Sequence, residues 1–206
     1  LLMISFFNLF FLVYALLYLK PSLKVNDMYE QDIWVFGYGS LIWKPGFEFA
    51  HQEIGRLQNY KRSFCIWSIH YRGTPEHMGL VLALDKVQGS NCDGLLFKIK
   101  AKNVEKVLSY LRKRELISDA YLEVIVDVKL NSGETVKAYT YLVNRNHEQY
   151  AGSLTIDDQA LIIKSAKGTI GSNTEYLYNV TKCLRDLGIK DPELEKLSYQ
   201  TRKLSE

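Results

Sequence analysis

The sequence predicts an α+β fold in which one domain is built around an antiparallel or mixed sheet. Runs rich in aromatic and β-branched residues dominate the chain up to Val143, whereas helical periodicity dominates after Thr155. A hairpin turn at residues 131–134 joins two strand-like runs. Strands that come mostly before the helices, rather than alternating with them, are typical of this class. The 206 residues, 47% of them hydrophobic, are enough for one domain with a real core.

Strand-like runs are separated by segments with turn composition. The first run, Ile33–Phe36, is closed by glycines, which predicts a strand that enters a loop. In the later hairpin, apolar residues alternate along Tyr121–Leu130, and Thr135–Val143 is the returning strand. Between these, we expect a loop over 46–51, one or two strands over 53–68, a turn over 72–76, a strand over 79–84, a turn over 85–91 and a strand over 93–99.

Four helices are predicted from apolar spacing and end signals. Apolar residues recur at helical spacing along Asn103–Arg114, and Asn103 is the expected N-cap. The other helices are expected over Thr155–Lys167, with Thr155 and Asp158 as a capping box, over Thr174–Leu187, ending at Gly188, and over Pro192–Leu204.

Composition argues against several classes of protein. The formal net charge is only +3, from 26 basic and 23 acidic residues, so we expect no nucleic-acid partner. The cysteines Cys65, Cys92 and Cys183 are odd in number and widely spaced, which indicates reduced, mostly buried thiols and a cytoplasmic location. The four histidines are scattered, and no zinc spacing is present, so we expect no metal.

The N-terminal segment stands apart from the rest of the chain. Residues 1–19 carry no charge and are long enough for a transmembrane helix, which needs about 20 apolar residues. An upstream extension, a membrane anchor and a signal peptide are three interpretations, although the sequence lacks a positive n-region and an A-x-A-like site. We take residues 1–27 as an apolar extension and residues 28–206 as the working domain. Membrane contact is expected only through residues 1–19.

The glycine-rich segment Val35–Leu41, with the sequence Val-Phe-Gly-Tyr-Gly-Ser-Leu, is the first candidate site. Two glycines that flank Tyr38 allow tight turning and a close approach to a ligand. Successive backbone N–H groups in such a loop can hold a carboxylate, and Ser40 adds a hydroxyl. The dinucleotide fingerprint is not matched. A plain turn at a strand end explains the segment equally well.

Glu115 is the second candidate, at the end of the helix predicted over residues 103–114. Apolar Leu116 and Ile117 follow it, and apolar surroundings raise the pKa of a carboxyl group towards a range useful for a general base. The cations of Arg112-Lys113-Arg114 act in the opposite direction. An ion-paired, solvated helix end remains the alternative.

Two tyrosines complete the set of candidates. Tyr176 belongs to a polar segment, residues 171–176, that enters a helix and can present N–H groups or a hydroxyl to an anion. Tyr150 lies in a similar but weaker context. Either tyrosine can instead be a packing residue with one hydrogen bond.

In this order, these segments resemble the ChaC-type glutathione-specific γ-glutamylcyclotransferases, and the similarity spans about residues 32–200. Several separate blocks in the right order are more specific than any single one. The matching blocks are residues 34–44, Arg62 with Phe64, residues 70–76 (His-Tyr-Arg-Gly-Thr-Pro-Glu), residues 79–84, Tyr110-Leu111 with Arg114-Glu115, and residues 171–177 (Gly-Ser-Asn-Thr-Glu-Tyr-Leu).

The resemblance implies a γ-glutamylcyclotransferase-like fold, a small mixed, barrel-like sheet with flanking helices. It implies that the γ-glutamyl group of glutathione is cyclised to 5-oxoproline with release of cysteinylglycine, without metal or cofactor. Glu115 matches the catalytic glutamate, which serves as general base and acid. A non-catalytic module that binds γ-glutamyl compounds or peptides is the alternative. The expected substrate-binding residues are Val35, Phe36, Gly37, Tyr38, Gly39, Ser40, Leu41, Tyr150 and Tyr176.

Departures from the family pattern occur at a few positions and bear on substrate recognition more than on the reaction. His77-Met78 precedes a glycine where the family usually has a proline. Ser63 and Cys65 interrupt a more basic and aromatic stretch. Glu123 stands where bacterial-type members commonly have a proline.

Overall fold

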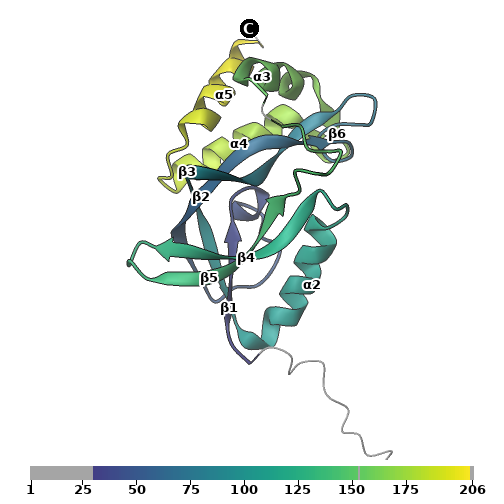
Figure 1. Cartoon of the computed structure of the whole chain (residues 1–206). Coiled ribbons are helices and arrows are strands. Elements are labelled where there is room, and N and C mark those ends of the chain that lie inside the picture. The colour runs from purple at the N-terminus through teal and green to yellow at the C-terminus, as the bar shows by residue number, and fades with distance from the viewer. Residues whose placement is uncertain (1–29, 153, 205–206) are drawn as a thin grey trace, which may run out of the picture.

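The computed structural model describes residues 30–152 and 154–204. The interpretations of residues 1–27 as an extension and of residues 1–19 as a membrane segment lie outside this part of the chain. Within it, a closed five-stranded barrel is accompanied by helices that pack along its side and at one end (Figure 1). The predicted α+β class and the barrel-like mixed sheet with flanking helices are confirmed.

The strands follow one another around the barrel in the order β1-β3-β2-β4-β5. Neighbours in this order are antiparallel. The ring closes because β5 returns beside β1 in parallel, pairing Ala138 with Trp34 and Tyr139 with Val35. A closed barrel leaves few unpaired strand edges. The strands are β1 (Ile33–Gly37), β2 (His51–Ser68), β3 (Gly79–Ile99), β4 (Tyr121–Leu130) and β5 (Thr135–Val143).

The long ribbon of β2 and β3 corrects one prediction. The turn expected over residues 85–91 is wrong, because this segment lies inside the single strand β3, which pairs with β2 on both sides of it. Here residues 87–90 bulge out opposite the single residue Asn59. The Gly89 N–H donates to the side-chain oxygen of Asn59 at 3.0 Å, and both residues have positive φ. Turn-forming residues therefore produce a bulge that leaves the ribbon continuous.

The helix that carries Glu115 is α2 (Val104–Glu115), which lies along the side of the barrel (Figure 1). A 3-10 turn, η3 (Ala101–Asn103), leads into it. Asn103 occupies the N-cap position as predicted, although its side chain makes no capping hydrogen bond. The Asp32 carboxylate instead accepts the N–H of Ala101 at 3.0 Å and ties this turn to the start of β1.

The three C-terminal helices pack on one another at one end of the molecule, and α3 and α4 also contact β3 (Figure 1). The hydroxyl of Thr155 accepts the N–H of Asp158 at 3.2 Å, which confirms the predicted cap. Gly188, with φ of 72°, follows the last turn of α4 as expected. The helices are α3 (Ile156–Ser165), α4 (Asn173–Asp186) and α5 (Pro192–Lys203).

The helix predicted to extend to Lys167 stops at Ser165. Lys167 instead belongs to a two-stranded hairpin, β6 (Lys167–Gly168) with β7 (Gly171–Ser172), which leads into α4. The chain turns between these strands, and Gly171 takes φ of 122°, a conformation that glycine adopts readily. The hairpin determines where α4 begins, and α4 carries Tyr176.

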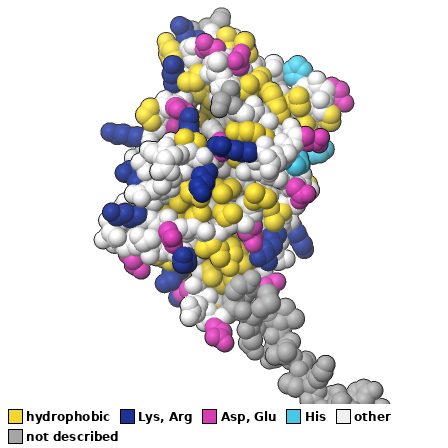
Figure 2. Space-filling model, in the orientation of Figure 1, with side chains coloured by type: hydrophobic (Ala, Val, Ile, Leu, Met, Phe, Trp, Pro, Cys, Tyr) yellow, Lys and Arg dark blue, Asp and Glu magenta, His cyan; other side chains and the backbone are white. Residues whose placement is uncertain are grey.

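The largest apolar core lies between the barrel and the helices. It joins side chains from β1, β2 and β3 with those of α2, α3, α4 and α5. On the face drawn in Figure 2, basic and acidic side chains are interspersed around apolar areas. Within the described residues, no helix has the length and apolar character needed to cross a membrane.

Candidate active site

The glycine loop folds back on the strand that leads into it. Gly37 ends β1, and a Cβ there would lie 3.0 Å from the Cβ of Leu41 and 3.2 Å from a ring carbon of Phe97. Glycine is the residue that leaves room for this close return of the chain. The chain then forms a short 3-10 helix, η2 (Ser40–Ile42). The predicted loop is thus a strand end that passes directly into a helical turn.

Several of the predicted loop residues are core residues. Val35 and Phe36 have no exposed surface, and Leu41 is also buried. Their side chains fix the loop in place, so direct contact with a ligand is left to the backbone and to residues such as Gly39 and Ser40. The assignment of these five residues to substrate binding stays a prediction.

Glu115 ends α2, and only 18% of its side-chain surface is exposed. Burial raises the pKa of its carboxyl above the ordinary 4.5, and the opposing effect of Arg114 is smaller. The negative end of the α2 dipole acts in the same direction as burial. Arg112 forms an ion pair with Glu123 at 2.8 Å and is not among the groups that lower the Glu115 pKa. Burial therefore outweighs the neighbouring cations, and the pKa of Glu115 is raised.

Four tyrosines form the surroundings of Glu115. Burial raises the pKa of Tyr38, Tyr121, Tyr141 and Tyr176, and the nearby charge of Glu115 raises it further in each case. The phenols therefore stay neutral at physiological pH. A largely buried, ionisable carboxylate among neutral phenols is suited to general acid-base chemistry.

Three of these hydroxyls have fixed acceptors. Tyr38 donates to the carbonyl of Tyr141 at 2.8 Å, and Tyr121 donates to the carbonyl of Leu82 at 2.8 Å. The hydroxyl of Tyr141 lies 3.1 Å from a carboxylate oxygen of Glu123. These bonds hold the aromatic rings in one arrangement around Glu115.

Arg114 connects α2 to the glycine loop. Its guanidinium donates to the hydroxyl of Ser40 at 2.7 Å, to the carbonyl of Lys44 at 2.7 Å and to the hydroxyl of Tyr110 at 3.1 Å. Its Nε atom lies 3.0 Å from a carboxylate oxygen of Glu115. That oxygen is buried and has no well-aligned hydrogen bond within the described residues. One side chain thus sets the distance between the loop and Glu115 and leaves a carboxylate oxygen able to accept a proton.

Tyr176 brings the third predicted segment to the same place. Its ring contacts Trp43 and Phe64, with centroid distances of 5.8 and 5.7 Å. A Cβ on Gly39 would lie 3.6 Å from the Tyr176 hydroxyl, which is ordinary contact distance. Ser172 caps α4 by accepting the N–H of Glu175 and so fixes the start of the helix that carries Tyr176. The glycine loop, Glu115 and the 171–176 segment are therefore assembled around one point.

Tyr150 lies in a different set of contacts. Its hydroxyl is 3.3 Å from one carboxylate oxygen of Asp85, and the other oxygen accepts from Arg145 at 2.7 Å. It packs near Cys65, whose burial raises the thiol pKa to about 11, so that thiol remains protonated at neutral pH. The role of Tyr150 in substrate binding stays a prediction. In the described part of the chain, no three His, Cys, Asp or Glu side chains are grouped as metal ligands would be.

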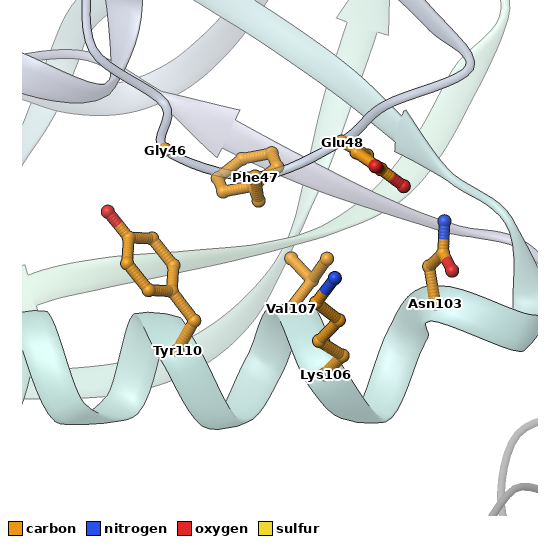
Figure 3. Close-up of a pocket in the computed structure, with 7 residues that line it drawn as sticks. All are labelled: Gly46, Phe47, Glu48, Asn103, Lys106, Val107 and Tyr110. Carbon is orange, nitrogen blue, oxygen red and sulfur yellow. The ribbon is translucent and has the colours of Figure 1, made fainter.

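A surface pocket of about 460 Å³ lies along α2, on the N-terminal side of Glu115 (Figure 3). Tyr110 links the two regions, because its hydroxyl accepts from Arg114. The ring of Phe47 and the side chain of Val107 provide the apolar part of the pocket. Neither Glu115 nor the glycine loop contributes to its wall, so we treat it as a neighbour of the site. The pocket is lined by Gly46, Phe47, Glu48, Asn103, Lys106, Val107 and Tyr110.

Sequence reasoning missed Tyr121, Tyr141 and Arg114 as site residues. The chain has 14 tyrosines, and nothing in their spacing distinguishes the two that face Glu115. The sequence predicts no contact between Arg114 and the glycine loop, because the hydrogen bond to Ser40 joins residues 74 positions apart. The signals for Arg114 are its place next to Glu115 and its presence in the matching family block with Tyr110.

Comparison with known proteins shows which chains this protein resembles. The model of the family described as ChaC-like protein matches residues 33–204. A glutathione-specific gamma-glutamylcyclotransferase of Escherichia coli is 33% identical over 175 residues, which cover 85% of this chain and 75% of the relative. Gamma-glutamylcyclotransferase 2-3 of Arabidopsis thaliana is 34% identical over 176 residues, which cover 82% of this chain and 88% of the relative.

A solved structure has the same architecture. The crystal structure of a yeast γ-glutamyl cyclotransferase specific to glutathione aligns with a TM-score of 0.76 and 25% sequence identity. The alignment covers 85% of this chain and 100% of the yeast chain. The barrel and its helices are therefore shared with a solved protein over that protein's full length.

Proposed function

The chain belongs to the ChaC-like family, and we propose on this basis that it cyclises the γ-glutamyl group of glutathione. The products are 5-oxoproline and cysteinylglycine. The single observation that supports this best is Glu115, a largely buried carboxylate with a raised pKa beside the glycine loop. A module that only bound γ-glutamyl compounds would have no need for such a base.

The reaction needs a proton to be moved twice. The α-ammonium of the γ-glutamyl unit cannot attack until a base removes a proton, and Glu115 is placed to do so. The freed nitrogen then attacks the γ-carbonyl carbon, and the bond from that carbon to the cysteine nitrogen breaks. Glu115 returns the proton to the departing nitrogen, and the ring nitrogen loses its second proton as the lactam forms, which leaves the new amino group of cysteinylglycine as an ammonium. Because the nucleophile and the carbonyl belong to one molecule, holding the substrate folded provides much of the rate.

The glycine loop is suited to hold the γ-glutamyl end of the substrate. Backbone N–H groups at the start of a helical turn such as η2 lack partners within the turn, so they can bind the α-carboxylate or the oxygen that becomes negative. Arg114 keeps this loop beside Glu115 through its hydrogen bond to Ser40.

The direct test is turnover of glutathione by the purified chain, with products identified by mass spectrometry. We expect 5-oxoproline and cysteinylglycine in equal amounts. Saturable binding of glutathione without either product would contradict the proposed reaction and favour the binding module. Since Cys65 and Cys92 are free and buried, we also propose a cytoplasmic location.

The rate should depend on pH through Glu115. The ionised carboxylate is the active base, and its pKa is raised, so kcat/KM for glutathione should increase with pH until that raised pKa is passed. Arg114→Gln removes the cation that opposes the shift, so the rising limb should move to higher pH. A pH profile of kcat/KM for both proteins measures this.

Lys113→Gln is the matched control, because Lys113 is the neighbouring cation on the same helical turn and does not contribute to the Glu115 pKa shift. Its profile should follow that of the unmodified chain. An unchanged profile in Arg114→Gln would show that the titrating group is not Glu115.

A further inference from the structure

A buried arginine, Arg72, lies where the loop after β2 meets the start of α4. We propose that Arg72 binds the glycine carboxylate of glutathione and so determines the preference of the enzyme for that tripeptide. This inference rests on the proposed function and deepens it by assigning the far end of the substrate. Arg72 was part of a matching block in the sequence but was given no role.

The contacts of Arg72 leave part of its guanidinium unused. One terminal nitrogen donates to the carbonyl of Ser172 at 2.9 Å and to the carboxylate of Glu175 at 3.1 Å. Its Nε is buried and has no hydrogen-bond partner within the described residues. Only 10% of the Arg72 side chain is exposed, whereas 55% of the Glu175 side chain is. A buried guanidinium with an open donor is unfavourable until an acceptor arrives, and a planar carboxylate matches its geometry.

Tyr176 connects the position of Arg72 to the glycine loop. Its guanidinium carbon lies 5.5 Å from the ring centre of Tyr176, whose hydroxyl faces Gly39 in the glycine loop. Charges from both Glu115 and Arg72 act on that hydroxyl. In glutathione, two residues separate the γ-carbonyl from the glycine carboxylate, about 7 Å when extended. A substrate whose γ-glutamyl end is held by the glycine loop can therefore extend along the Tyr176 ring towards Arg72.

Arg72 is better suited to this role than the other arginine beside the site. The guanidinium of Arg114 is already occupied by Ser40, Lys44, Tyr110 and Glu115. Arg72 is also next to the N-terminus of α4, where the helix dipole favours a negative charge. The exposed Glu175 is a partner that a substrate carboxylate can replace.

The experiment compares glutathione with its glycine amide, which keeps every atom of the reaction but lacks the terminal charge. Formation of 5-oxoproline gives kcat/KM for each compound. The unmodified chain should prefer glutathione by about tenfold to hundredfold, the range for one charge-assisted contact. In Arg72→Gln, the ratio of the two kcat/KM values should fall towards one. Arg72→Lys, which keeps the charge but loses the planar fork, should lie between them.

Glu175→Gln is the matched control, because it removes the partner and keeps the arginine. It should not raise KM for glutathione. Equal turnover of the two compounds by the unmodified chain overturns the inference without requiring any variant to fold. A preference that survives in a folded Arg72→Gln also overturns it. A chain that forms 5-oxoproline from neither compound overturns the proposed function itself and this inference with it.

Discussion

Glu115→Gln is expected to lower kcat for glutathione by about a hundredfold to ten-thousandfold, the range for loss of a general base. Glutamine has the same shape as glutamate but cannot take the proton from the α-ammonium. The substitution should not destabilise the folded state. Because burial raises the Glu115 pKa above 4.5, the folded state holds its proton more tightly than the unfolded chain does.

The sign of this linkage provides a second measurement. The free energy of unfolding of the unmodified chain should contain a component that decreases as the pH rises from 4.5 through the raised pKa. Glu115→Gln should lack this decrease, as measured by urea unfolding across that pH range. Glu134→Gln, in the exposed turn between β4 and β5, is the control for both experiments. Full activity in a folded Glu115→Gln would exclude Glu115 as the base.

Asn173→Ala is expected to reduce the free energy of unfolding by about 2–5 kcal/mol, because two buried backbone groups lose their partner. Asn173 has no exposed surface. Its side-chain nitrogen donates to the carbonyl of Leu80 at 2.7 Å, and its oxygen accepts the N–H of Leu80 at 2.6 Å. The amide thus pairs with the start of β3 as a neighbouring strand would.

Activity should fall together with stability in this variant, because Asn173 fixes the first turn of α4 and Tyr176 follows three residues later. Thr174→Ala is the matched control at the next position, where the hydroxyl pairs with that of Ser172 at 3.0 Å and makes no bond to β3 within the described residues. It should change stability by less than about 1 kcal/mol. Thermal unfolding and glutathione turnover, measured on both variants, separate the two effects. Equal stability of the two variants would contradict the argument.

The predicted elements were right where local pattern was enough. The β4–β5 hairpin and the cap at Thr155 are formed by residues that are close together in the sequence, so the local pattern predicts them. The segment over residues 85–91 was misread because turn and bulge use the same residue types. What distinguishes them is the partner strand, and Asn59 lies about 30 residues away in the sequence.

The site was predictable to a similar degree. Glu115 and the glycine loop were found because they form ordered blocks in the chain. The direction of the Glu115 pKa shift could not be predicted from the sequence, because it depends on how deeply the folded chain buries the carboxylate. Tyr121 and Tyr141 come from β4 and β5, and only closure of the barrel brings them to Glu115.

The parallel pairing of β1 with β5 has a consequence for the order of folding. The hydroxyl of Thr140 in β5 donates to the carbonyl of Phe36 in β1 across 104 positions of the chain. Contacts that distant form late, because a long loop must close before they stabilise anything. During synthesis on the ribosome, β1 therefore cannot pair with β5 until the hairpin that ends at Val143 has emerged. The glycine loop follows β1 directly, so the barrel around it closes only after the β2–β3 ribbon has had time to form, and the site is completed later still, when α4 brings Tyr176 to Gly39.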